Sequence, residues 1–167
     1  MRDRAYHRRH VVGEVVLMPK ARIEVGTEVS STDRQILTDG LSAFNRLHVP
    51  SDDHSPLCVF ARSENGETIG GLLGETFWRW LHIELLWISE DHRGQGLGTQ
   101  LLMAAEDEAI DRDCTGAFVN TMDFQAPEFY LKLGYSEAGQ IPDLPPGHHR
   151  VHLQKRFDIL CPLSADG

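Results

Sequence analysis

The sequence predicts a single domain of mixed α/β architecture, of the α+β type. Helix-like and strand-like periodicities follow one another in the order strand, helix, three strands, helix, strand, helix, two strands. The last of the three consecutive strands leads directly into a loop with glycine at every second position, and this loop opens into a helical segment. A chain of 167 residues with 41% apolar content can form one sizeable core, and a second domain is not expected.

The domain is expected to cover residues 21–158. Residues 1–20 are basic at first, and their apolar run is interrupted by Gly13 and Glu14, so they make a poor signal peptide. We interpret them as a disordered extension or as residues that precede the native start. Residues 159–167 are expected to form a C-terminal tail.

The first half of the domain contains four predicted strands and one helix. Polar and apolar side chains alternate over residues 22–25, which indicates a half-buried strand. Apolar residues then recur with helical spacing from Leu37 to Leu47. Three strands follow as an antiparallel meander, with turns at Asn65-Gly66 and Trp78-Arg79. These strands are expected at residues 57–61, 68–77 and 80–88.

The second half contains two helices and three strands. One helix is expected from Leu97 to about Asp113, and the other begins at Pro127, which suits a first helical turn, and ends before Gly134. The strands are expected at residues 117–121, 135–141 and 149–156.

The glycine loop between the third strand of the meander and the next helix predicts an anion-binding site. Gly94, Gly96 and Gly98 have no Cβ, so the backbone can turn tightly and its free N–H groups can approach a phosphate at the helix N-terminus. A P-loop is disfavoured because no lysine precedes Thr99. A dinucleotide fingerprint is disfavoured because its third glycine would have to stand at position 99.

Two motifs resemble those of the GNAT superfamily of N-acetyltransferases. Residues 93–98 read Arg-Gly-Gln-Gly-Leu-Gly and match the pattern Arg/Gln-x-x-Gly-x-Gly/Ala of that family's coenzyme A pyrophosphate loop. Residues 130–135 resemble its Tyr-x-Lys-x-Gly-Phe/Tyr segment. The resemblance implies a mixed, mostly antiparallel sheet of about seven strands flanked by helices, splayed between the fourth and fifth strands, with acetyl-CoA as the acetyl donor.

The resemblance also implies which residues bind the cofactor. Asp123 stands where relatives often have asparagine, which leaves open either a contact with coenzyme A or a cap on the following helix. The implied cofactor-binding residues are Leu86, Trp87, Ile88, Arg93, Gly94, Gln95, Gly96, Leu97, Gly98, Thr99, Asp123 and Tyr130.

Acetyl transfer to an amine requires an oxyanion donor, an acid for the leaving thiolate and a base. The resemblance places the donor in the backbone N–H groups of residues 86–88 and nominates Tyr130 as the acid. Glu84 stands two residues before Leu86, so it is expected to share that residue's face and to act as the base. His82, two residues further back, is the rival, because an imidazole suits proton transfer at neutral pH.

Composition restricts the partners. The formal net charge of −9 argues against nucleic acid or an anionic membrane and is compatible with a cationic acceptor, expected to be a small primary amine. A protein lysine or N-terminus, and a non-catalytic acyl-CoA-binding module, remain alternatives. Three cysteines without metal-ligand spacing indicate a reducing compartment, here the cytoplasm, and no metal site. The resemblance alone makes a homodimer plausible.

Overall fold

The computed structural model describes residues 23–49 and 54–158, and these belong to two compact units that divide after Leu41. The predicted extension at residues 1–20 and the predicted tail at residues 159–167 lie outside the described residues. No helix in the described part is long and apolar enough to cross a membrane.

Helix α1, Ser31–Asn45, contains the predicted apolar periodicity and continues through Gly40. Its first turn is capped by the Ser30 hydroxyl, which accepts a hydrogen bond from the Asp33 amide at 2.9 Å. The predicted strand at residues 22–25 is wrong over its described part, because residues 23–25 are irregular. Alternation of side chains over so short a segment does not by itself supply a pairing partner.

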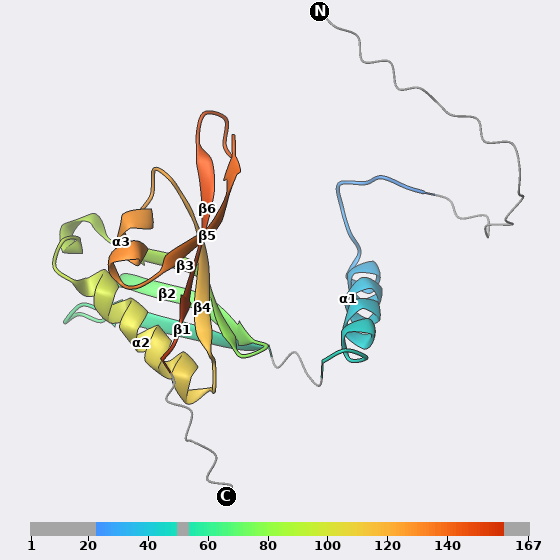
Figure 1. Cartoon of the computed structure of the whole chain (residues 1–167), viewed down its shortest axis with the longest axis horizontal. Coiled ribbons are helices and arrows are strands. Elements are labelled where there is room, and N and C mark those ends of the chain that lie inside the picture. Colours follow the sequence, from blue (N-terminus) through green and yellow to red (C-terminus); the bar gives the residue numbers. More distant parts are fainter. Residues whose placement is uncertain (1–22, 50–53, 159–167) are drawn as a thin grey trace, which may run out of the picture. The chain divides into compact units, whose positions relative to one another are not determined.

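The second unit is a six-stranded sheet with two helices, α2 and α3, and a short 3-10 helix, η1 (Figure 1). The strands lie in the order β1-β2-β3-β4-β6-β5, and only β3 and β4 are parallel. The predicted order of elements is confirmed from β1 onward. The bounds are β1 Ser55–Arg62, β2 Thr68–Phe77, β3 Trp80–Ile88, η1 Glu90–His92, α2 Leu97–Asp111, β4 Gly116–Met122, α3 Pro127–Lys132, β5 Ser136–Pro142 and β6 His149–Arg156.

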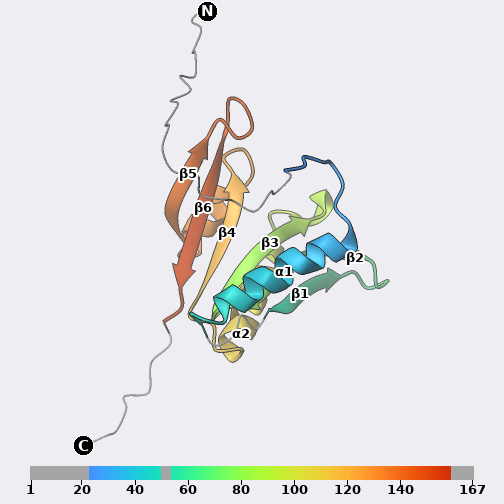
Figure 2. The same cartoon turned by 90° about the vertical axis from the view of Figure 1, so that its right-hand side faces the viewer.

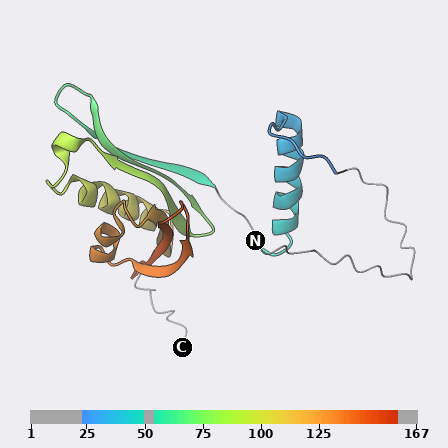
Figure 3. The ribbon, with the colours of Figure 1, turned by 90° about the horizontal axis from the view of Figure 1, so that it is seen from above.

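The core lies between α2 and the sheet. Both α2 and α3 lie on one side of it (Figure 3), and α2 contacts β1, β2 and β3. Burial of a leucine or isoleucine side chain stabilises a fold by roughly 1.5–3 kcal/mol. The least exposed large side chains are Leu57, Leu72, Leu81, Ile83, Leu102 and Leu153.

The pairing of β3 and β4 covers only part of their length. It joins residues 80–83 of β3 to residues 116–119 of β4 and then ends. Figure 2 shows the two strands diverging from this short pairing. The predicted splay between the fourth and fifth strands is therefore confirmed, as the separation of β3 and β4.

A β-bulge in β3 lies where this separation starts. Leu73 of β2 pairs with Leu85, whereas the next residue, Gly74, pairs with Ile83, so Glu84 is the extra residue. A Cβ on Gly74 would run into the carbonyl group of His82. The bulge therefore depends on a glycine opposite it.

We expect Gly74→Ala to destabilise the protein by about 1–3 kcal/mol, because the new methyl group has backbone rather than a flexible side chain in front of it. Gly40→Ala is the matched control. A Cβ there meets nothing within 4 Å, and alanine favours a helix interior by about 0.5–1 kcal/mol over glycine. Urea unfolding of both variants measures the difference. Equal stability of Gly74→Ala and wild type would contradict the proposed role of Gly74.

Candidate active site

The glycine loop has the backbone of an anion site. Gly94 and Gly96 have φ angles of 73° and 81°, in the left-handed region that favours glycine, and Gly96 is the N-cap of α2. No side chain caps this helix, so the first-turn amides of residues 97–99 remain free to bind an anion. A Cβ on Gly94 or Gly96 would meet no protein atom within 4 Å, so the space beside the loop is open.

Two side chains hold the loop in place. Arg93 donates from Nε to the Ile88 carbonyl at 3.0 Å, and Gln95 donates from Nε2 to the Asp91 carbonyl at 3.1 Å. Both bonds tie the loop to backbone that precedes it. Arg93 also borders the cleft described next.

A cleft of about 860 Å³ occupies the space where β3 and β4 separate. Its walls come from β3 on one side and from β4 and α3 on the other. Ile88, Arg93 and Gly98 also border a second, smaller hollow beside the glycine loop, so the cleft and the loop are continuous. The cleft is lined by residues 83–88, Arg93, Gly98, residues 119–121, 124–126, Phe129 and Tyr130.

Free backbone amides of β3 face this cleft. The Ser89 amide donates to the Ile69 carbonyl on β2, and the direction of backbone N–H groups alternates along an antiparallel strand. The amides of Leu86 and Ile88 therefore point away from β2 and toward the cleft. The Trp87 amide points toward β2, so Leu86 and Ile88 are the residues of this stretch whose amides can serve an oxyanion.

Tyr130 of α3 lies on the opposite wall of the cleft. Its side chain is buried, and its hydroxyl makes no hydrogen bond within the described part of the chain. Burial raises the pKa of Tyr130 to about 12, so the phenol keeps its proton at neutral pH. The neighbouring Tyr135 differs, because its hydroxyl donates to the buried Glu106 carboxylate at 2.9 Å.

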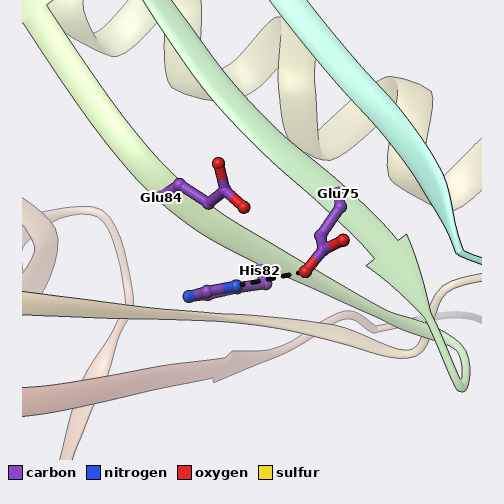
Figure 4. A group of neighbouring side chains, drawn as sticks. All are labelled: Glu75, His82 and Glu84. Carbon is purple, nitrogen blue, oxygen red and sulfur yellow. Dashed lines mark ion pairs between the residues drawn. The ribbon is translucent and has the colours of Figure 1, made fainter. Parts of the chain in front are cut away.

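Glu84 and His82 lie together, with Glu75 of β2 beside them (Figure 4). The prediction that Glu84 shares a face with Leu86 is wrong. The bulge interrupts the alternation, so Leu86 pairs with the core residue Leu72 while Glu84 lies on the side of His82 and Glu75. Glu84 still lines the cleft and is exposed.

Asp123 lies at the end of β4 but does not cap α3, so the prediction of a helix cap is wrong. The N-cap of α3 is Ala126, and the Asp123 carboxylate lies 3.2 Å from Nδ1 of His148 and 3.2 Å from Nδ1 of His149. Partial burial works against the charge on Asp123. The two histidines and the Phe124 amide outweigh burial and hold the pKa of Asp123 below its usual value.

Comparisons with known proteins identify the family of this chain. The sequence pattern of the Acetyltransferase (GNAT) family matches residues 29–135. The chain belongs to this family. A blasticidin-S acetyltransferase from Streptomyces morookaense is 47% identical over 102 residues, which are 59% of this chain and 75% of that protein.

Solved structures of acetyltransferases share the GNAT fold seen here. A 1.9 Å crystal structure of an acetyltransferase from Bacillus cereus is 30% identical, with a TM-score of 0.77 over 84% of this chain and 100% of that one. An aminoglycoside 6′-N-acetyltransferase complexed with coenzyme A has a TM-score of 0.55 over 78% of this chain and 95% of that one, at 19% identity, which is a likeness of fold alone.

The sequence reading of this GNAT chain did not include Glu75. A usable signal was present, because a two-residue turn at Trp78-Arg79 pairs Phe77 with Trp80 and therefore places Glu75 opposite His82. Thr121 of β4, Phe124 in the loop that follows and Phe129 of α3 were also not predicted to line the cleft. Their place in the cleft follows from the separation of β3 and β4, for which the local pattern carries no signal.

One group in the described residues has donor atoms suited to a cation. One atom each of Glu75, His82 and Glu84 lies within 4.8 Å of the others. Nδ1 of His54 also lies 3.0 Å from Oε2 of Glu75, so one carboxylate oxygen of the group already has a partner. No metal is needed for acetyl transfer, and the prediction of a metal-free site stays a prediction.

We expect Gly96→Ala to weaken acetyl-CoA binding about tenfold, because alanine in a left-handed conformation costs roughly 1–2 kcal/mol and relaxation of the loop turns its amides away from the anion. The matched control is Gly66→Ala in the β1–β2 hairpin. It has a φ of 84° and equally open surroundings, but it lies outside the cleft. Calorimetric titration with acetyl-CoA compares the two. Equal affinities in both variants would argue against this binding site.

We expect Asp123 to stabilise the folded protein in a pH-dependent way. Its pKa is lower in the folded state than the unfolded value of about 3.9, so its contribution is fully present above that value and is lost as the pH falls through the folded pKa. Denaturant unfolding of wild type and Asp123→Asn at a series of pH values from 6 to 3 measures the contribution. A stability difference that grows as the pH falls would contradict this assignment.

Proposed function

We propose that this acetyltransferase transfers the acetyl group of acetyl-CoA to the primary amine of a small cationic molecule, by direct attack in a ternary complex. The observation that carries the proposal is the cleft between β3 and β4. It places an exposed carboxylate, two free amides and a protonated phenol around one space that opens beside the glycine loop.

Each of these groups is assigned one step of the reaction. Glu84 accepts a proton from the acceptor ammonium, and the resulting amine attacks the thioester carbonyl. The amides of Leu86 and Ile88 stabilise the developing oxyanion, because fixed donors in a cleft need no reorganisation during the reaction. Tyr130 gives its proton to the departing thiolate, and the nitrogen loses its second proton. One ammonium and one thioester yield an amide, a free thiol and one released proton.

Burial affects both the phenol and the thiolate. A pKa of about 12 makes Tyr130 a weak acid, but the same lack of solvation disfavours a free thiolate in the cleft. Proton transfer to sulfur is therefore expected as the carbon–sulfur bond breaks, without a long-lived thiolate.

The glycine loop and α2 hold the cofactor in this proposal. The free amides at the N-terminus of α2 and the guanidinium of Arg93 bind the pyrophosphate, and the pantetheine arm runs between β3 and β4. Gln95 acts indirectly, since its side chain supports the loop.

The acceptor is proposed to be a small molecule. The named relative from Streptomyces morookaense is a blasticidin-S acetyltransferase, so blasticidin S is the first acceptor to test. The net charge of −9 favours a cationic molecule over an anionic one. A lysine or N-terminus of a protein is the alternative, and an acceptor panel that contains a lysine peptide distinguishes it.

We place the reaction in the cytoplasm, because Cys58 and Cys114 carry free thiols, which are typical of a reducing compartment. A homodimer remains a prediction from the family resemblance.

We expect Tyr130→Phe to lower kcat by about 10² or more while acetyl-CoA binding stays unchanged, since only the proton donor is lost. A free-thiol assay with blasticidin S, putrescine, an aminoglycoside and a lysine peptide provides the readout. Tyr135→Phe is the matched control. It removes the hydroxyl that binds Glu106, so it should lower stability by about 1–3 kcal/mol and spare kcat.

Two results would count against these assignments. Wild-type kcat in Tyr130→Phe would show that Tyr130 is not the acid. Absence of thiol release by the wild type with every amine in the panel would overturn the proposed function.

A further inference from the structure

Glu75 is a carboxylate beside the reacting groups that the mechanism above does not use. It stands on β2 directly opposite His82, and its side chain is 32% exposed. Figure 4 shows the Glu75 carboxylate pointing toward His82, on the same side of the sheet as Glu84. Oε1 of Glu75 lies 3.7 Å from Nδ1 of His82, longer than a hydrogen bond, so the two groups adjoin without satisfying each other.

Aromatic contacts fix the histidine of this group. The His82 ring is stacked on Phe118 of β4, with centroids 4.6 Å apart and an interplanar angle of 8°. Phe77 meets the His82 ring edge-on at 6.4 Å. The ring therefore cannot turn freely, and its position beside Glu75 and Glu84 is set before any ligand arrives.

The charge of the two glutamates is not neutralised by a permanent cation. In residues 54–158, Glu75 has ion-pair contacts only with His54 and His82, and Glu84 forms no hydrogen bond or ion pair. Two carboxylates so close together repel each other, and a cation between them relieves that repulsion. The group is also continuous with the large cleft, because Glu84 lines it.

The spacing of the group can be compared with the spacing expected around a primary ammonium and around a metal ion. Three acceptors that each receive one N–H of an ammonium group at ~2.8 Å in a tetrahedral arrangement lie ~4.6 Å apart. Three ligands of a tetrahedral metal at ~2.1 Å lie only ~3.4 Å apart. The donor atoms of Glu75, His82 and Glu84 all lie within 4.8 Å of one another, so they can surround one ammonium nitrogen, and the EDTA experiment below separates this ligand from a metal ion.

We propose that Glu75 is an acceptor-binding residue, which together with His82 and Glu84 receives the acceptor as a primary ammonium ion. This inference rests on the proposed function. The ammonium gives one proton to the Glu84 carboxylate, which becomes a carboxylic acid, and the nitrogen becomes a neutral amine. Glu75 keeps its charge, so the nitrogen is still held when Glu84 no longer attracts it.

The specificity of the site follows from this arrangement. A primary ammonium has three N–H donors for the three acceptor atoms, whereas a tertiary ammonium has one and a quaternary ammonium has none. Primary amines are therefore selected already at the binding step, before acetyl transfer. A quaternary analogue of an acceptor is expected to be a poor competitive inhibitor.

The test uses Glu75→Gln in the full chain, with the acceptor that the wild type acetylates fastest in the panel above. We expect the KM for the acceptor to rise about tenfold or more, because a charge-assisted hydrogen bond becomes a neutral one. The kcat and the KM for acetyl-CoA should change by less than about threefold, since Glu75 takes no proton and touches no cofactor. Glu84→Gln should instead lower kcat.

Three further variants separate this role from a structural one. Glu64→Gln removes an exposed carboxylate of the β1–β2 turn and should leave all constants unchanged. His54→Gln removes the other partner of Glu75 and should leave the acceptor KM within about threefold of wild type. Glu75→Asp keeps the charge and should restore part of the acceptor affinity that is lost in Glu75→Gln. Because both variants alter the same side chain, this comparison separates loss of the charge from loss of stability in the glutamine variant.

Each remaining outcome overturns the inference or its basis. If the wild type acetylates an amine and Glu75→Gln has an unchanged acceptor KM, Glu75 does not bind the acceptor, while the proposed function stands. A loss of activity on EDTA treatment that zinc restores would assign the group to a metal and exclude the ammonium. If the wild type acetylates no amine, the proposed function fails and this inference fails with it.

Discussion

The limited pairing between β3 and β4 is the constraint on which the rest of the site depends. The two strands are joined over residues 80–83 and 116–119, and beyond these residues each keeps partners only on its other side. Backbone amides that a continuous sheet would satisfy are left facing a cleft. Such amides are costly unless water or a ligand occupies the space, so the same feature that interrupts the sheet creates the cleft that we propose as the binding site.

The bulge at Glu84 determines which side chains face the proposed acceptor site. One extra residue turns Leu86 toward the core, against which it packs, and leaves Glu84 beside His82 on the other side of the strand. Gly74 permits this, because the His82 carbonyl occupies the space of a side chain. A single β-bulge therefore determines both which side chain packs against the core and which carboxylate lines the cleft.

Much of this arrangement could be predicted from the sequence. The order of elements from β1 onward and the glycine loop follow from local patterns: the turn residues, the helical spacing after Gly96 and the proline that starts α3. Tyr130 and the loop residues are predicted by two motifs, at residues 130–135 and 93–98, because each motif fixes the spacing of its residues.

The remaining features are not local. Strand alternation predicts a common face for Glu84 and Leu86, and it fails because a bulge depends on the partner strand. Asp123 is of a residue type that often caps helices, but its carboxylate contacts two histidines that lie 25 and 26 positions further along the chain. The irregular residues 23–25 show the reverse case, in which a strand pattern is present without a partner.

The short pairing between β3 and β4 also has a mechanical consequence. The antiparallel sheet β1-β2-β3 packs against α2 and the antiparallel sheet β4-β6-β5 packs against α3, while Glu106 of α2 links the two halves through side-chain bonds to Tyr135 and Lys155. The junction between the halves is the place where transient opening disrupts the fewest backbone hydrogen bonds. A cofactor bound across that junction joins the halves, and amide exchange along β4 should slow when it binds.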